Sequence, residues 1–185
     1  MGGAMRELVL ASNNAGKLAE LQMLFAPLGW QLRPQSDFDV PEADEPFHTF
    51  VENALAKARH AAALTGLPAV ADDAGLCVDA FDGLPGVQTA HYATQFGYPK
   101  GDAGNVRALL EQLDGVAQRR AALVSNLVAD RTAPDPEPLI AVGRAVGEIT
   151  TDAKGSHGFG FDPVMYLPEL GQTFAELDPE VKNQY

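Results

Sequence analysis

The stretch from Thr49 to Leu76, TFVENALAKARHAAALTGLPAVADDAGL, predicts a helix that leads into a buried strand. Thr49 is a suitable N-cap, and Glu52 three residues later completes a capping box. Gly66 and the proline that follows at position 68 are typical of a helix C-terminus. An apolar stripe recurs at helical spacing, formed by Phe50, Ala54, Ala58 and Ala61. Cap residues at both ends and an apolar stripe along one face therefore predict the helix.

The strand expected at 69–71 is small and apolar, and it is expected to end at two carboxylates, Asp72 and Asp73. Neighbouring carboxylates at the end of a buried strand raise each other's pKa unless a cation lies between them. Mg2+ accepts such oxygens and keeps waters for a phosphate ligand. Glu45, in the acidic loop 34–46, is close enough to the helix start to reach the same site. The alternative is that the sequence DDAG is a turn, which the tetrapeptide alone favours.

The composition is that of a globular protein that can bury a sizeable core. The chain has 185 residues, 46% hydrophobic and 21% charged, which suits one domain or one domain with a small lobe. The net charge of −12 argues against sequence-independent binding of nucleic acid, although it allows a nucleotide to bind together with Mg2+. The single cysteine, Cys77, excludes an internal disulfide and fits a reducing cytoplasm. No apolar run predicts a membrane span, and Met1–Ala11 lacks the core of a signal peptide.

A polar loop near the N-terminus predicts a phosphate site. Glu7–Ala11 is expected to be a strand, Ser12–Lys17 (SNNAGK) follows it, and an amphipathic helix comes next. Backbone N–H groups and the helix dipole attract an anion there, and Lys17 adds a full charge. The glycine and lysine spacing differs from a Walker A loop. A solvated helix start capped by serine or asparagine explains the same residues equally well.

The remaining segments predict a mixed fold. The expected elements are strands at Trp30–Arg33, Leu76–Ala80, Arg119–Ala129 and Leu139–Ile149, and a helix within Gly101–Asp114. The last two strands have only a proline-containing loop between them, which indicates an antiparallel hairpin. A hairpin interrupts the alternation of strands and helices, so the fold class is α/β with a mixed sheet.

The segment Gly155–Asp162 (GSHGFGFD) has glycines that let backbone approach a ligand closely. Its two phenylalanines, Phe159 and Phe161, offer flat faces on which a nucleobase can stack. A strand with one buried aromatic face explains the same alternation, and this interpretation is favoured when the segment is considered alone.

Taken together and in this order, the motifs resemble the inosine triphosphate pyrophosphatases, a family that acts on non-standard purine nucleoside triphosphates. The matching segments are SNNAGK at 12–17, TFVENALAKA at 49–58, DDAGL at 72–76, GLPG at 83–86, GFGFDP at 158–163 and TFAELDPEVKN at 173–183. The resemblance implies one domain over 1–185, built on an elongated mixed sheet with two lobes and a substrate cleft between them. It also implies a cytoplasmic, homodimeric, Mg2+-dependent hydrolase that converts ITP, dITP or XTP to the monophosphate and pyrophosphate.

The resemblance assigns roles to matching positions. Phosphates would be bound by Ser12, Asn13, Asn14, Ala15, Gly16, Lys17 and Lys57, with Ala74 beside the substrate. Mg2+ would be placed by Glu45, Asp72 and Asp73, with Asp73 as general base toward water. The base would be bound by Phe159, Gly160, Phe161, Asp162 and Lys182, of which Phe159 stacks on it and Lys182 contacts the purine ring.

Three departures from the family pattern bear on the substrate site, the first of them on base selection. Relatives continue after Lys182 and Asn183 to a Ser-His-Arg, whereas this chain stops at Tyr185. Either its C-terminal end is truncated, or base discrimination is weakened. Ala74 stands where many relatives have a serine that would touch the phosphates or substrate. Thr89-Ala90-His91 replaces the usual Ser-Ala-Arg.

Two other functions are compatible with parts of the sequence. A Maf-like pyrophosphatase for pyrimidine or methylated nucleotides shares the fold more distantly, but SNNAGK and TFVENALAKA favour the first family. A non-catalytic nucleotide-binding module is the other alternative. The retained Asp72, Asp73 and Lys57 argue against it, because a binder needs no general base. Small purine triphosphates are the expected partners, and neither nucleic acid nor a membrane is expected.

Overall fold

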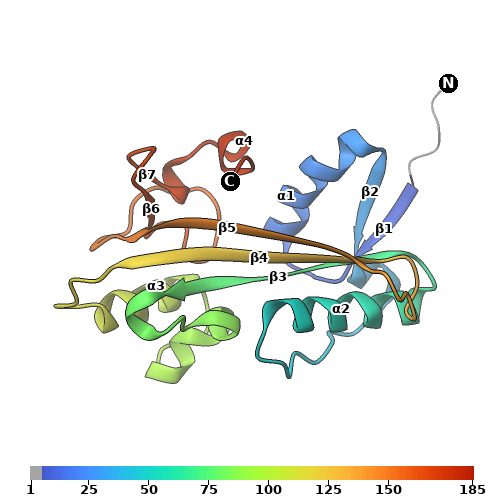
Figure 1. The fold of residues 1–185 in the computed structure, drawn as a ribbon, viewed down its shortest axis with the longest axis horizontal. Coiled ribbons are helices and arrows are strands. Elements are labelled where there is room, and N and C mark those ends of the chain that lie inside the picture. Colours follow the sequence, from blue (N-terminus) through green and yellow to red (C-terminus); the bar gives the residue numbers. More distant parts are fainter. Residues whose placement is uncertain (1–5) are drawn as a thin grey trace. The chain divides into compact units, whose positions relative to one another are not determined.

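The computed structural model describes residues 6–185, so the first five residues of the N-terminal stretch lie outside it. Its described part contains a seven-stranded sheet of order β2-β1-β3-β4-β5-β6-β7 (Figure 1). The strands are β1 Arg6–Leu10, β2 Trp30–Pro34, β3 Ala69–Val78, β4 Arg120–Asp130, β5 Leu139–Ile149, β6 Met165–Leu167 and β7 Gln172–Thr173. β1 pairs in parallel with β2 and β3, whereas β6 is antiparallel to β5 and β7. The predicted mixed α/β class is confirmed.

The α-helices are α1 Ala15–Phe25, α2 Phe50–Thr65, α3 Asp102–Gln112 and α4 Pro179–Lys182. Short 3-10 segments occur at η1 Ala26–Leu28, η2 Gln35–Phe38, η3 Asp79–Phe81, η4 Gly86–Phe96 and η5 Phe174–Glu176. The loop predicted after Phe81 is therefore partly helical. Within residues 6–185, no helix has both the length and the apolar composition needed to cross a membrane.

The chain forms two compact units. Unit 1 contains the residues up to Asp73 together with Asn126–Val142, and unit 2 contains Ala74–Ser125 and Gly143–Tyr185. The strands β3, β4 and β5 contribute residues to both units. Unit 2 has its own core, in which Leu76, Leu109, Met165 and Phe174 are among the buried side chains.

Alternation along the strands of unit 1 separates its apolar side chains into two clusters. One cluster joins Val9, Ala69 and Ala71 to α2, and the other joins Leu8, Leu10 and Val70 to Leu18 and Leu21 of α1. Because successive strand residues point to opposite faces, the two helices cover opposite faces of β1 and β3. This arrangement decides which helix each aspartate of β3 meets.

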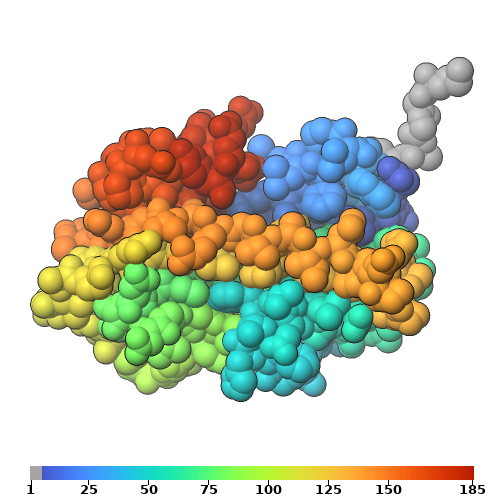
Figure 2. Space-filling view, in the orientation of Figure 1, coloured from blue at the N-terminus to red at the C-terminus, as the bar shows by residue number. Residues whose placement is uncertain are grey.

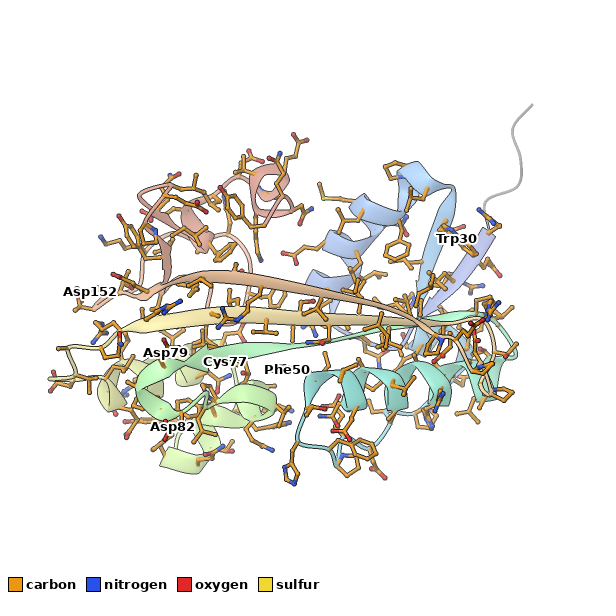
Figure 3. All side chains as sticks on the ribbon, in the orientation of Figure 1. Trp30, Phe50, Cys77, Asp79, Asp82 and Asp152 are labelled. Atoms are coloured by element: carbon orange, nitrogen blue, oxygen red, sulfur yellow. The ribbon has the colours of Figure 1, made fainter. Side chains whose placement is uncertain are left out.

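The structure of α2 confirms its predicted N-cap and C-terminus, whereas the Glu52 carboxylate bonds the Thr49 hydroxyl, which is not the reciprocal bond of a capping box. The Thr49 hydroxyl accepts the Glu52 N–H at 3.4 Å and lies 2.5 Å from the Glu52 carboxylate, and Gly66 adopts a φ of +68° at the C-cap. The buried stripe consists of Ala54, Ala58, Ala61 and Ala62. Phe50, predicted as its first member, is only half-buried at the start of the helix (Figure 3). The small side chains let the helix pack closely on the strands.

The prediction that a strand ends at Asp72 was wrong. β3 continues from Ala69 to Val78, so Asp72 and Asp73 lie in the middle of a strand, and neither the predicted strand end nor the alternative turn is present there. A separate strand was predicted at 76–80. Residues 76–78 form the end of β3, and residues 79–80 belong to η3. Aspartate and glycine disfavour strands locally, but pairing with neighbouring strands overrides that preference.

Asp130, at the end of β4 in unit 1, is 2% exposed, and neither of its carboxylate oxygens has a hydrogen-bond partner. Burial raises its pKa; Arg59 opposes the shift, and Asp135 adds to it. A carboxyl group with a raised folded-state pKa costs no stability below its unfolded pKa. It destabilises the fold progressively as the pH rises through the folded pKa.

We therefore expect Asp130→Asn to raise Tm by about 2 °C or more at pH 7.5, and to change it little at pH 4. Thermal denaturation at both pH values measures this. The exposed Asp114→Asn is the control, for which no such pH-dependent gain is expected. A less stable Asp130→Asn protein at pH 7.5 would contradict the assignment of Asp130 as a costly buried charge.

Candidate functional site

The loop Ser12–Lys17 is ordered by its own side chains. Asn14 is the N-cap of α1, and its Oδ1 accepts the Lys17 N–H at 3.1 Å. The Asn14 N–H in turn donates to Ser12 Oγ at 3.1 Å. Asn13 Oδ1 accepts the Ser36 N–H at 3.2 Å, which ties the loop to η2. The asparagine-capped helix start is confirmed, and it places Lys17 in the first turn of α1, with Ala15 and Gly16 preceding it.

Two aspartates of β3 meet lysines from two different helices. Asp72 shares its face with Val70 and pairs with Lys17 of α1, Nζ to Oδ2 at 2.9 Å. Asp73 shares its face with Ala71 and pairs with Lys57 of α2, Nζ to Oδ1 at 3.0 Å. The alternation of the strand thus gives each carboxylate its own ammonium group. All of these residues belong to unit 1.

Lys57 also binds Glu45. Its Nζ lies 2.9 Å from Glu45 Oε1, so the ammonium group bridges the loop carboxylate and Asp73. The Lys57 and Asp73 side chains are each only 12% exposed, whereas the Glu45 side chain is 43% exposed. The structure therefore brings together the predicted residues Glu45, Lys57 and Asp73.

Burial is the largest influence on both members of the central ion pair. It raises the pKa of Asp73, and the opposing effect of Lys57 does not cancel the shift. Burial lowers the pKa of Lys57, but Asp73 and Glu45 together outweigh it, and the net shift is upward. Lys57 therefore remains an ammonium ion at neutral pH, while Asp73 is a stronger base than an exposed aspartate.

The cluster has the donor chemistry of a magnesium site. Glu45, Asp72 and Asp73 offer carboxylate oxygens, which Mg2+ prefers. Asp73 Oδ2 is buried and has no hydrogen-bond partner, which is uncommon for a buried polar atom. Across residues 6–185, however, no three acidic, histidine or cysteine side chains are already gathered as ligands of one ion. The carboxylates are instead held by the two lysines.

The aromatic loop of unit 2 is organised by Asp162, which is 4% exposed. Its Oδ2 accepts the Phe159 N–H at 2.9 Å and pairs with Lys182 Nζ at 2.6 Å. Lys182 Nζ lies 4.7 Å from the centre of the Phe159 ring, in a cation–π contact. A Cβ at Gly158 would collide with the Asp162 carboxylate, which explains the glycine at that position.

The alternative that 155–162 is a strand was wrong, because these residues form bends followed by a turn. Phe159 is half-buried, whereas the Phe161 side chain is 2% exposed and belongs to the core of unit 2. The Gly160 N–H donates to Asp102 Oδ2 at 2.7 Å. Asp102 holds this loop although sequence reasoning missed it, because it is far from the loop in the chain and belongs to no motif.

The structure also places two positions at which this chain departs from the family pattern. Ala74 is half-buried in β3, and His91 is exposed in η4.

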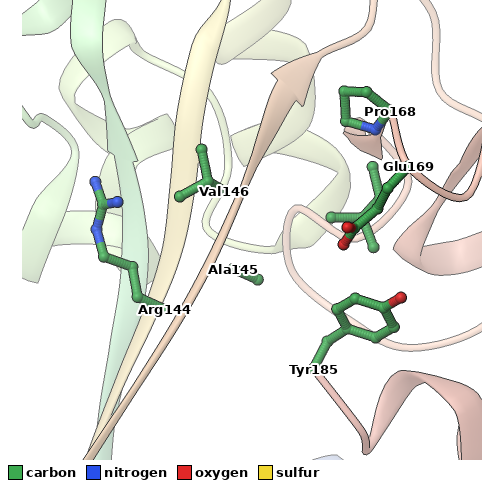
Figure 4. Close-up of a pocket in the computed structure, with 7 residues that line it drawn as sticks. Arg144, Ala145, Val146, Pro168, Glu169 and Tyr185 are labelled. Carbon is green, nitrogen blue, oxygen red and sulfur yellow. The ribbon is translucent and has the colours of Figure 1, made fainter.

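A hollow of about 430 Å³ in unit 2 is lined by Arg144, Ala145, Val146, Leu167, Pro168, Glu169 and Tyr185 (Figure 4). None of the predicted site residues lines this hollow, so its size alone does not make it the site.

A mixed α/β fold with a polar loop at a helix start and lysine-paired carboxylates on a central strand is typical of proteins that handle phosphorylated ligands. The chain belongs to the Ham1 family, whose model matches residues 8–185. The family predicted from the motifs is thereby confirmed.

Proteins similar over nearly the whole chain support this assignment. A protein of Paracidovorax citrulli named dITP/XTP pyrophosphatase is 74% identical over 97% of this chain and 90% of its own length. One from Acidovorax sp. with the same name is 72% identical over 97% and 87%. The solved HAM1 protein of Coxiella burnetii is 45% identical, with a TM-score of 0.87 over 97% of this chain and 90% of that one. The Ham1 protein of Staphylococcus aureus is 35% identical, with a TM-score of 0.82 over the same shares.

Proposed function

We propose that this protein hydrolyses the non-standard purine nucleotides dITP, ITP and XTP to the nucleoside monophosphate and pyrophosphate. The observation that carries the proposal is the cluster of Asp72, Asp73 and Glu45 with Lys17 and Lys57. The relatives named dITP/XTP pyrophosphatase support the choice of substrates. Removal of these nucleotides would keep them out of the pool used for nucleic acid synthesis.

The triphosphate would be bound by residues of unit 1. Cleavage of a phosphoanhydride needs charge neutralisation and an oriented water more than covalent chemistry. Lys17 and Lys57 supply two positive charges, and Lys57 keeps its proton because two carboxylates outweigh its burial. Ser12 and Asn14 add hydrogen-bonding groups at the start of α1.

The carboxylates would hold Mg2+ and accept a proton. Glu45 and Asp73, which both pair with Lys57, would be its ligands, and Asp72, on the other face of β3, would join them only after leaving Lys17. Bound Mg2+ would neutralise phosphate charge. Asp73 is the general base of choice, since burial raises its pKa and its Oδ2 has no hydrogen-bond partner. In that role Asp73 removes the proton from the attacking water.

The base would be bound by residues of unit 2. Phe159 offers a half-buried aromatic face for stacking, and Asp162 orients the Lys182 ammonium group beside it. An ammonium donor aimed at position 6 accepts the oxo group of hypoxanthine or xanthine and disfavours the amino group of adenine. Guanine also carries a 6-oxo group, so its rejection depends on contacts at position 2.

We also propose that the protein is a cytoplasmic homodimer. The strand β5 exposes apolar side chains in unit 1, with Leu139 at 76%, Ile140 at 53% and Val142 at 65% exposure. Such an apolar surface supports self-association. The substrates belong to the cytoplasmic nucleotide pool, which fits the single cysteine of the chain.

Pyrophosphate release from dITP, ITP, XTP, GTP, ATP and dTTP, with and without Mg2+, tests the proposal. We expect Mg2+-dependent release from the first three substrates, with kcat/KM at least about 100-fold above that for ATP. Equal release from all purines would retain the chemistry and refute the base selection. Release only from dTTP would favour a Maf-like enzyme. No release by the folded protein would favour a nucleotide-binding module.

A further inference from the structure

Asn53, in the first turns of α2, is 1% exposed, and both its amide oxygen and its amide nitrogen bond one residue of the preceding loop. Its Oδ1 accepts the Phe47 N–H at 3.0 Å, and its Nδ2 donates to the Phe47 carbonyl at 3.2 Å. These two bonds hold the backbone of Phe47 as a neighbouring strand would. The Phe47 side chain is 42% exposed, so backbone bonds rather than side-chain packing hold the loop here.

The loop held in this way is the one that carries Glu45. Residues 40–48 form no helix or strand and are mostly exposed, so the position of the loop depends on its few attachments to other parts of the chain. At the far end of the loop, His60 Nε2 lies 3.0 Å from the Pro41 carbonyl. Glu45 is therefore bracketed by two attachments, and its own carboxylate meets Lys57 between them.

The three attachments come from a single face of α2. Asn53, Lys57 and His60 stand at positions i, i+4 and i+7, which lie on one side of a helix. The buried alanine stripe that packs on the strands lies on a neighbouring side of α2. One helix face thus fixes the helix in unit 1, and the other holds the acidic loop; α2 and the loop preceding it form a continuous blue-green surface (Figure 2).

We propose that Asn53 is a positioning residue for Glu45: through Phe47 it holds the acidic loop so that the Glu45 carboxylate is kept beside Lys57 and Asp73. This inference rests on the proposed function, because it concerns how the carboxylate cluster binds Mg2+. Residues that orient metal ligands through a second layer of hydrogen bonds alter metal affinity by 10- to 100-fold when they are replaced. Asn53 is almost fully buried, and its role is carried by its two hydrogen bonds to the Phe47 backbone.

The test is Asn53→Ala in the full chain, with Mg2+ as the probe. We expect the Mg2+ concentration for half-maximal pyrophosphate release to rise about tenfold or more, with kcat at saturating Mg2+ close to wild type. Two readouts do not depend on activity. Amide hydrogen exchange in 41–47 should become about tenfold faster or more, and the rise in Tm on adding Mg2+ should be smaller.

Asn105→Ala is a matched control. Asn105 is 3% exposed and makes the same kind of two-sided clamp in unit 2, accepting the Ala93 N–H at 2.8 Å and donating to the Ala90 carbonyl at 3.4 Å. It should lower Tm about as much as Asn53→Ala does, without changing the Mg2+ dependence. His60→Ala, which removes only the surface attachment at Pro41, is a second variant whose fold should survive if Asn53→Ala does not; it should raise the Mg2+ requirement less.

A double-mutant cycle with Glu45→Gln tests whether Asn53→Ala changes the Mg2+ requirement through the Glu45 carboxylate. If Asn53 acts through the Glu45 carboxylate, Asn53→Ala should add little to the Mg2+ requirement of Glu45→Gln. Full additivity, or equal shifts in Asn53→Ala and Asn105→Ala, would overturn the proposal. A wild-type protein that releases no pyrophosphate would refute the proposed function instead, while hydrogen exchange and the Mg2+-induced change in Tm would still decide whether Asn53 positions Glu45.

Discussion

Asp73→Asn is expected to lower kcat for pyrophosphate release from dITP by about 1,000-fold. The amide keeps an oxygen that can accept the Lys57 N–H now made to Asp73 Oδ1 at 3.0 Å, so the geometry of the cluster is retained. It removes the negative charge and the basic Oδ2, the buried atom without a partner. The variant therefore separates proton acceptance and metal charge from packing. Steady-state kinetics at saturating Mg2+ measure the effect.

The loss of activity should come with only a small change in stability. The amide removes the cost of the buried charge on Asp73, whose pKa burial raises, but it also takes from Lys57 one of the two carboxylates that offset its own burial. Because the two effects oppose each other, we expect Tm to change by less than about 3 °C. Asp37→Asn is the matched control in unit 1, because Asp37 is exposed and pairs with Arg33 outside the cluster; its kcat should stay within about twofold of wild type. Near-normal kcat in Asp73→Asn would exclude Asp73 as the general base.

Gly155→Ala is expected to destabilise the protein by about 4 kcal/mol or more, which lowers Tm by roughly 10 °C in a domain of this size. Gly155 has a φ of +83°, and a Cβ there would collide with the Ala175 carbonyl group and lie 2.5 Å from Glu176 N. The approach is close because Ser156 and His157 both donate their N–H groups to the Ala175 oxygen, at 3.1 and 3.0 Å. The atoms that the new Cβ would meet all belong to the backbone, so no flexible side chain can move aside to relieve the collision.

Gly97→Ala separates strain from collision. Gly97 has a similar φ of +79°, and a Cβ there would meet no atom within 4 Å. Only the cost of a left-handed conformation remains, about 1–2 kcal/mol. Chemical denaturation of both variants measures the difference. Equal losses in the two variants would mean that the backbone around Ala175 yields easily, and that the contact with Gly155 is not a fixed feature of unit 2.

The helix α2 shows what local sequence is able to predict. Its N-cap at Thr49, the alanines of its buried stripe and its stop at Gly66 depend on groups within a few residues of one another, and these are found as expected. β3 shows the opposite. Asp72 and Asp73 have the local preferences of a turn, yet pairing with neighbouring strands keeps them in the middle of a strand.

The sequence by itself determined the family, through six motifs in order, and the chemistry available to it: carboxylates, lysines, a polar loop and an aromatic loop. Only the tertiary structure decided which groups meet. Asp72 pairs with Lys17 and Asp73 with Lys57, because alternate residues of one strand face different helices. Such pairings depend on sheet hydrogen bonds and burial between segments far apart in the chain, and no local pattern encodes them.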